Sequence, residues 1–182
     1  VLDKNNGLKT VYDQFQSATN MTDKTSALNL LINHDKDDTY ASSALADFYC
    51  QYKNENLVVN LWLQLQATNQ QPGGLSRVQS LMEHESFTIK NPNKVRSLIG
   101  SFASSNHFNF HDKLGTGYEF LGEQILKLNT LNPQVAARLV TPLTRWSDYE
   151  EPYANLMKKQ LKVIKASPGL VSDVYEVVTK SL

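Results

Sequence analysis

The sequence predicts an all-α protein built as a curved array of HEAT- or armadillo-like antiparallel helix pairs. Apolar residues recur every three or four positions through almost the whole chain, which is the spacing of a helix with one buried face. Alternating strand patterns are absent, since the short run at 87–89 is too brief to seed a sheet. Two similar helix starts, at Asn91 and Asn132, lie about 40 residues apart, close to the period of HEAT-type repeats.

Turn residues divide this periodic pattern into separate helices. Asp37 and Asp38 precede the third helix, where acidic side chains favour the positive end of the helix dipole. Helix stops are predicted where glycine or proline interrupts the pattern, at 72–73, 115–117 and 168–169. The predicted helices span 8–15, 25–32, 40–52, 57–65, 75–82, 93–103, 118–128, 133–143, 149–164 and 170–179.

Two of these helices share a capping device, because an Asn-Pro pair begins at Asn91 and again at Asn132. The Asn side-chain oxygen accepts a backbone N–H that has no partner within the helix. Proline at the first helical position loses nothing, since its missing N–H would have been unpaired there. The repeated device supports stacked helix pairs.

Composition limits the classes of protein. A length of 182 residues suits a single helical-repeat domain covering 1–182. The chain has 18 Lys plus Arg and 18 Asp plus Glu, and this neutral balance argues against a dedicated nucleic-acid binder. Apolar runs stay well short of the ~20 residues that span a bilayer, so no transmembrane segment is predicted.

The lone cysteine and the first residues bear on the cellular location of the chain and on whether it is part of a longer protein. Cys50 has no partner for an internal disulfide and follows Phe48-Tyr49 in an apolar stripe, so we predict a buried structural thiol. No basic-then-apolar leader is visible, and the expected location is the cytoplasm. The start Val1-Leu2-Asp3-Lys4 resembles neither a leader nor a helix cap, which suggests a cut made inside a longer protein.

Each catalytic motif that the sequence approaches lacks at least one required residue. A zinc-peptidase helix needs His-Glu-x-x-His, but the segment that starts at His84 has Thr88 where the second histidine must stand. His107 and His111 have the spacing of helical metal ligands, yet no third ligand is evident nearby, and we expect a short loop or single turn there. No nucleophile elbow or phosphate loop is present. The sequence therefore predicts no catalytic residue and no metal ligand in this chain.

Two of the few arginines occupy nearly equivalent places on the two Asn-Pro helices. Arg96 and Arg138 each lie beside an apolar stripe. Corresponding helices of a curved array line the same face, so both guanidinium groups would reach one concave surface and hold a carboxylate or peptide carbonyls. Two alternatives remain open, an ion pair between helices and an arginine that extends its charge to solvent. Trp62 and Trp146 are expected in the core.

Several segments resemble the C-terminal region of the bacterial aminopeptidase N family, the alanyl aminopeptidases among the zinc metallopeptidases. The most specific is NPNKVRSLIGSF at 91–102. The resemblance covers about 44–182 and is weaker over the first forty residues. Its other segments are ALADFY at 44–49, Trp62 with QAT at 66–68, SFT at 86–88, FH at 110–111, GYEFL at 117–121, LNPQVAARL at 131–139, DVYE at 173–176 and TKSL at 179–182.

The resemblance implies a role in a larger enzyme. Aminopeptidase N removes N-terminal amino acids from peptides with one zinc ion held by two His and a Glu, while a Gly-x-Met-Glu-Asn segment grips the free amino terminus. Neither motif is present here. The family's C-terminal domain is a bowl of helical repeats that closes over the catalytic domain. By resemblance, Arg96, Gln134 and Arg138 match positions that line its substrate chamber.

Two functional hypotheses follow from these observations. The first is the C-terminal domain of a zinc-dependent aminopeptidase, with the catalytic and N-terminal domains of the same polypeptide and the peptide substrate as partners. The zinc ligands would lie outside this chain, which would be inactive by itself. The alternative is a stand-alone HEAT-like module that binds a protein segment on its concave face. An upstream reading frame that encodes the zinc and amino-terminus motifs would favour the first.

Overall fold

Two helix starts in the computed structural model, which describes residues 4–182, carry the Asn caps expected from the sequence. The Asn91 side-chain oxygen accepts the N–H of Asn93 at 3.0 Å, and that of Asn132 accepts the N–H of Val135 at 3.2 Å. The helices are α1 (Lys4–Ser17), α2 (Met21–His34), α3 (Ala41–Tyr52), α4 (Asn56–Ala67), α5 (Gly74–Met82), α6 (Pro92–Val95), η1 (Arg96–Gly100), α7 (Ser101–Ser105), α8 (His107–Phe110), α9 (Thr116–Leu131), α10 (Pro133–Leu139), α11 (Thr141–Thr144), η2 (Trp146–Asp148), α12 (Tyr153–Ala166) and α13 (Ser172–Ser181).

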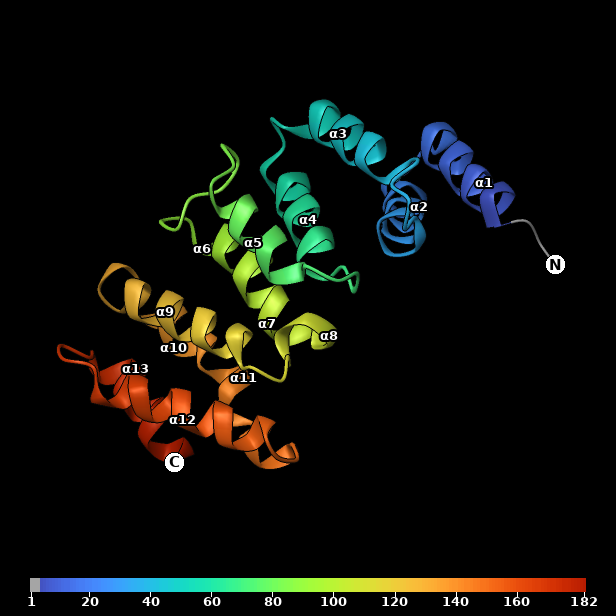
Figure 1. Ribbon diagram of the computed structural model, residues 1–182. Helices are drawn as coiled ribbons and strands as arrows, with labels where there is room; N and C mark the ends of the chain where they lie inside the picture. Colours follow the sequence, from blue (N-terminus) through green and yellow to red (C-terminus); the bar gives the residue numbers. More distant parts are fainter. Residues whose placement is uncertain (1–3) are drawn as a thin grey trace.

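The helices follow one another in chain order along a bent path, with α1 and α13 at opposite ends of the array (Figure 1). Among the closely packed pairs, α1 packs on α2 and α9 on α10, which are adjacent along the chain, while α4 packs on η1 and α9 on α12 across intervening helices. Residues 4–182 contain no strand, and the predicted all-α class is confirmed. Buried side chains form one continuous core, whose largest fully buried members include Tyr118, Phe15, Phe48, Phe102 and Phe110.

Prolines account for the two clearest differences from the predicted boundaries. The helix expected over 133–143 is two short helices, because α10 ends at Leu139 and α11 begins at Thr141. Pro142 has no N–H to donate and its ring clashes with the carbonyl of the residue four positions earlier, so a continuous helix cannot pass through it. The helix expected from Tyr149 starts instead at Tyr153, directly after Pro152.

The helix expected over 93–103 is continuous from Pro92 to Ser105 but changes winding in its middle. Between Arg96 and Gly100 it is a π-helix, and the N–H of Ser101 bonds to the carbonyl of Arg96, five residues back. Such a wide turn accommodates one extra residue inside an otherwise regular helix.

The single turn expected around the two closely spaced histidines is confirmed as α8, and a buried asparagine fixes its position. Asn106 is fully buried, and its Nδ2 donates to the carbonyls of Ala67 and Asn69, both at 2.8 Å. Its Oδ1 accepts the N–H of Asn109 at 3.2 Å. One polar side chain therefore joins the start of α8 to the end of α4.

The predicted burial of Cys50 is wrong, because its thiol is exposed. The face that α3 buries consists of Ala41, Ala44 and Phe48. A residue two positions after Phe48 is turned about 200° around the helix axis, onto the opposite side. Because Cys50 directly follows apolar residues in the sequence, the pattern did not show that it lies on the opposite side of the helix. Trp62, by contrast, is buried as expected, with 6% of its surface exposed, and Trp146 is half-buried.

The predicted stop and restart at 115–117 is confirmed. Gly115 has a φ of 77°, a left-handed conformation suited to glycine, and α9 begins at the next residue. Gly117 serves a different purpose, since a Cβ atom on it would lie 2.4 Å from the carbonyl oxygen of Phe110. The absence of a side chain there lets α9 approach the end of α8.

Among the described residues, no helix has both the length and the apolar character required to cross a bilayer. The segment Val1–Asp3, on which part of the sequence argument rests, lies outside the described residues.

Candidate functional site

A pocket of about 450 Å³ lies where η1 and α7 face α10 and α11. We name it the basic pocket, because its lining includes three arginines and no Asp or Glu. Its remaining wall comes from α8 and from the residue after η2. The lining residues are Arg96, Gly100, Ser101, Ala103, Ser104, His107, His111, Val135, Arg138, Leu139, Thr141, Pro142, Arg145 and Tyr149.

Small and apolar residues from the two Asn-Pro helices form the floor of the basic pocket. Ala103, Val135 and Leu139 are buried there. A Cβ atom on Gly100 would lie 3.7 Å from Leu139 Cδ2, an ordinary van der Waals contact, so the two helices meet closely at this point. An apolar floor below a charged rim suits a ligand with both apolar and anionic parts.

The three arginines differ in their partners. Arg145 Nε lies 3.0 Å from Asp148 Oδ2 in an exposed ion pair. Arg96 Nη2 donates to the side-chain oxygen of Asn93, a neutral group that leaves the charge uncompensated. Arg138 is exposed, and neither a hydrogen bond nor an ion pair engages it among the residues that the structure describes. Its guanidinium group is therefore available to an anion.

Aromatic groups build the wall of the basic pocket at α8. His111 Nδ1 lies 2.8 Å from the hydroxyl of Tyr118, which is itself buried in the core. The imidazole of His111 stacks on Tyr149, with ring centroids 4.5 Å apart, and on His107 at 5.7 Å. This stack holds His111 half-buried at the pocket wall.

Acid is expected to destabilise the chain through His111. Burial, with a smaller repulsion from His107, lowers the pKa of His111 from 6.5 to about 4. The folded state therefore binds fewer protons than the unfolded state between these values, and stability present above pH 6.5 is lost as the pH falls toward 4. Urea unfolding at several pH values should show this loss, and His111→Gln should reduce it. An equal pH dependence in both proteins would contradict this assignment.

The structure brings two of the three predicted site residues together. Arg96 and Arg138 line the same pocket, as expected from their equivalent places after the Asn-Pro caps. No ion pair joins either of them to a carboxylate among residues 4–182, which removes the first alternative. Gln134 is exposed one helical turn before Arg138 on α10 and is not among the pocket-lining residues.

Sequence reasoning did not assign Arg145, His107 or Tyr149 to this site. Arg145 had a usable signal, because it is one of only four arginines. The four-residue spacing of His107 and His111 is that of helical metal ligands, but both residues line the basic pocket. Within residues 4–182, no group of three His, Cys, Asp or Glu side chains is placed to hold a metal ion. His84 Nδ1 is instead paired with the hydroxyl of Ser86 at 2.8 Å.

Comparison with known families gives the affiliation of this helical array. Residues 1–182 match the sequence profile of a family described as a domain of unknown function (DUF3458_C) with ARM repeats. The chain belongs to this family. The ARM-repeat description agrees with the helix pairs of the structure and confirms the predicted class of fold.

This DUF3458_C domain is similar to one region of much longer proteins. It is 39% identical to aminopeptidase N of Haemophilus influenzae, with 98% of this chain and 20% of that protein covered. It is also 39% identical to aminopeptidase N of Escherichia coli, with 94% and 20% covered. A crystal structure of Legionella pneumophila aminopeptidase A in complex with aspartic acid matches with a TM-score of 0.92 and 35% identity, covering 99% of this chain and 21% of that one. The chain thus spans about a fifth of the length of these relatives, and the resemblance to the C-terminal region of aminopeptidase N is confirmed.

Proposed function

We propose that this DUF3458_C domain is the C-terminal domain of a zinc-dependent aminopeptidase, where it closes over the active site and lines the substrate chamber. The observation that carries the proposal is its similarity, over 98% of its own length, to a fifth of a protein named aminopeptidase N. Neither a zinc motif nor an amino-terminus motif is present in its sequence, so the chemistry would belong to the other domains of that polypeptide.

The basic pocket supports a specific task in that enzyme. Guanidinium groups bind carboxylates and carbonyl oxygens with paired N–H donors of fixed geometry. Arg138 has no partner among the described residues and stands above an apolar floor. In the proposed enzyme, Arg96 and Arg138 would hold the part of the peptide downstream of the bond to be cut. Gln134, exposed one turn earlier, would belong to the polar lining of the chamber.

Because the proposal places the zinc chemistry in the other domains of the polypeptide, this chain is expected to be inactive by itself. The 182-residue chain is expected to release no product from an amino-acid arylamide and to bind no stoichiometric zinc, as measured by a chromogenic assay and by metal analysis after dialysis. The full-length protein, prepared in the same way, serves as the positive control. Peptidase activity that persists in the short chain after removal of contaminating peptidases would refute the proposal.

The alternative of a stand-alone interaction module makes a different prediction. It requires a protein partner outside any aminopeptidase and a gene that encodes little beyond this chain. An upstream frame encoding His-Glu-x-x-His and Gly-x-Met-Glu-Asn would decide for the enzyme. The cytoplasmic location remains part of the proposal, and fractionation of cells that express the full-length protein tests it.

A further inference from the structure

Three cations line the basic pocket, and no carboxylate does. Arg96 comes from η1, Arg138 from α10 and Arg145 from the residue after α11, and all three are exposed to solvent, so a ligand can reach them. A guanidinium group remains protonated in proteins, so the three charges persist at every physiological pH. Like charges around one cavity repel one another, and a bound anion relieves that repulsion.

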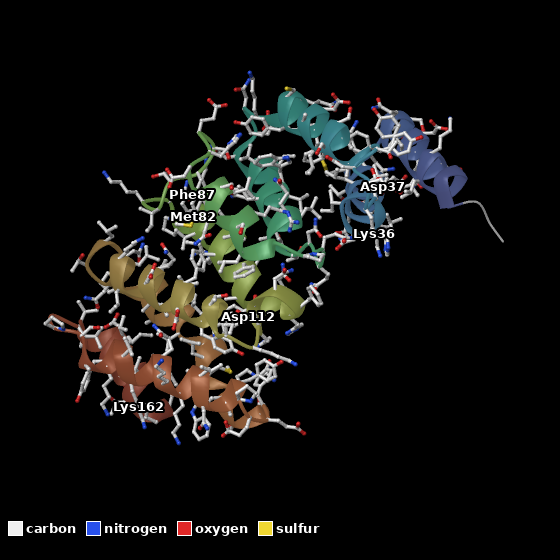
Figure 2. The ribbon with its side chains drawn as sticks, in the orientation of Figure 1. Lys36, Asp37, Met82, Phe87, Asp112 and Lys162 are labelled. Carbon is white, nitrogen blue, oxygen red and sulfur yellow. The ribbon has the colours of Figure 1, made fainter. Side chains whose placement is uncertain are left out.

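The carboxylates that lie near the pocket in sequence leave most of this charge uncompensated. Asp112, labelled in Figure 2, accepts the hydroxyl of Thr116 at 2.7 Å and the N–H of Gly117 at 3.2 Å, at the start of α9. Asp148 lies 3.0 Å from the Nε of Arg145, in an ion pair whose two side chains are 66% and 51% exposed. Such an exposed pair contributes little to stability and gives way readily to a ligand.

Each of the three guanidinium groups keeps N–H donors for a ligand. Among the described residues, Arg96 uses only Nη2, which donates to the side chain of Asn93, and Arg145 uses only Nε. Arg138 makes no hydrogen bond and no ion pair within the same part of the chain. The planar fork of a guanidinium group fits the two oxygens of a carboxylate, which accept two parallel N–H groups.

The floor of the pocket adds a second requirement for the ligand. It consists of the buried residues Ala103, Val135 and Leu139, together with Gly100, which has no side chain. Apolar surface of this kind is stabilised when an apolar group covers it. The volume of about 450 Å³ is in the range of small-molecule sites, about 300–1,000 Å³, and suits the end of a peptide. The pocket therefore fits an anionic group that is attached to an apolar one.

We propose that the basic pocket binds the terminal carboxylate of a short peptide, with the apolar side chain of the last residue on the floor. The carboxylate accepts N–H groups of Arg138, and Arg96 and Arg145 supply the further donors. This inference deepens the proposed function and rests on it for the identity of the ligand as a peptide. In the proposed enzyme, the site favours short peptides with a free carboxyl end and an apolar last residue, and its positive charge disfavours a last residue of lysine or arginine.

Calorimetric titration of the 182-residue chain at low ionic strength tests the ligand class. N-acetyl-alanyl-leucine, which carries a terminal carboxylate and an apolar side chain, is expected to bind. Its C-terminal amide lacks the charge and is expected to bind about tenfold more weakly or worse. N-acetyl-alanyl-glycine lacks the apolar side chain and is expected to bind several-fold more weakly. Absence of binding by the leucine peptide, or equal binding of its amide, would overturn the proposal.

Two more probes separate the terminal carboxylate from other sources of negative charge. The α-amide of N-acetyl-alanyl-aspartic acid has its only carboxylate in the side chain, and inorganic phosphate has no apolar group. Both are expected to bind more weakly than N-acetyl-alanyl-leucine. Tighter binding of the aspartic compound would make an acidic side chain the ligand and overturn the proposal. Phosphate binding as tight as that of the leucine peptide would show that the three arginines act as independent surface charges, which also overturns it.

Three variants locate the bound peptide. Arg138→Gln and Arg96→Gln keep a polar side chain but remove the charge, and each is expected to weaken binding of N-acetyl-alanyl-leucine about tenfold. Lys159→Gln is the matched control, because Lys159 is an exposed cation on α12 that does not line the basic pocket. It should bind like the parent chain. Full affinity in both arginine variants, or an equal loss in all three, would refute the assignment.

These titrations use no peptidase assay, so failure of this inference can be told apart from failure of the proposed function. An active full-length aminopeptidase whose 182-residue chain binds no leucine peptide would refute the carboxylate site and leave the proposed function standing. Specific binding by the short chain, with a full-length protein that releases no amino acid from peptides, would support the site and refute the function.

Discussion

Replacing Arg138 with alanine in the proposed full-length aminopeptidase is expected to lower kcat/KM for peptides by about 10- to 100-fold, the equivalent of one charge-assisted hydrogen bond of about 1.5–3 kcal/mol. The use of a single-residue arylamide should change much less, because that substrate has no residues downstream of the cut bond. The reason is that Arg138 stands at the basic pocket without a partner among the described residues. Steady-state kinetics on both substrates measures the difference.

A matched control separates a local contact from a general effect of charge. Lys162 is an exposed cation on α12 outside the basic pocket (Figure 2), so Lys162→Ala removes one positive charge elsewhere. It should leave both substrates unaffected. Peptides with a free or an amidated C-terminus then show whether Arg138 holds a carboxylate or a carbonyl. Equal losses on peptide and arylamide in Arg138→Ala would remove the case for a downstream contact.

The substitution Gly117→Ala is expected to lower the free energy of unfolding by about 1–3 kcal/mol. The new methyl group would lie 2.4 Å from the carbonyl oxygen of Phe110, and that atom belongs to the backbone, which cannot rotate away. Relief requires α8 and α9 to separate, which exposes the buried edge of Phe110. Urea denaturation followed by circular dichroism measures the change.

Gly7→Ala is the control for the loss of glycine flexibility. Gly7 lies within α1, and a Cβ atom there would meet nothing within 4 Å. Alanine is the better helix former by about 1 kcal/mol, so this variant should be as stable as the parent or slightly more stable. If Gly117→Ala were also neutral, the close approach of α8 and α9 would have no energetic importance.

Features that depend on neighbouring residues were predictable from the sequence. The Asn91 and Asn132 caps were placed correctly because their hydrogen-bond partners lie two or three residues away. The stop at Gly115 was also local, since one left-handed residue ends the pattern. Such local signals mark where helices start and stop, and the helical period between them predicts the all-α class.

Features that depend on rotation or on distant segments were not predictable. Cys50 was assigned to the core because its neighbours are apolar, although the angle around α3 directs it to solvent. Arg145 lines the basic pocket from the end of α11, a short helix that the apolar period does not separate from α10. Asp35 and Arg77 line one pocket from separate elements, and no spacing along the chain indicates this.

The π-helical segment that begins at Arg96 gives the long helix of 92–105 two separate phases. One extra residue in a helix shifts the direction of every later side chain by about 100° relative to those before it. Arg96 and Ser101 both line the basic pocket across this shift. With regular winding, Arg96 and Ser101, which are five residues apart, would point about 140° apart around the helix axis, so the wide turn brings both to the basic pocket. The position of the Arg96 side chain at the basic pocket therefore depends on the winding of the backbone as well as on the residue type.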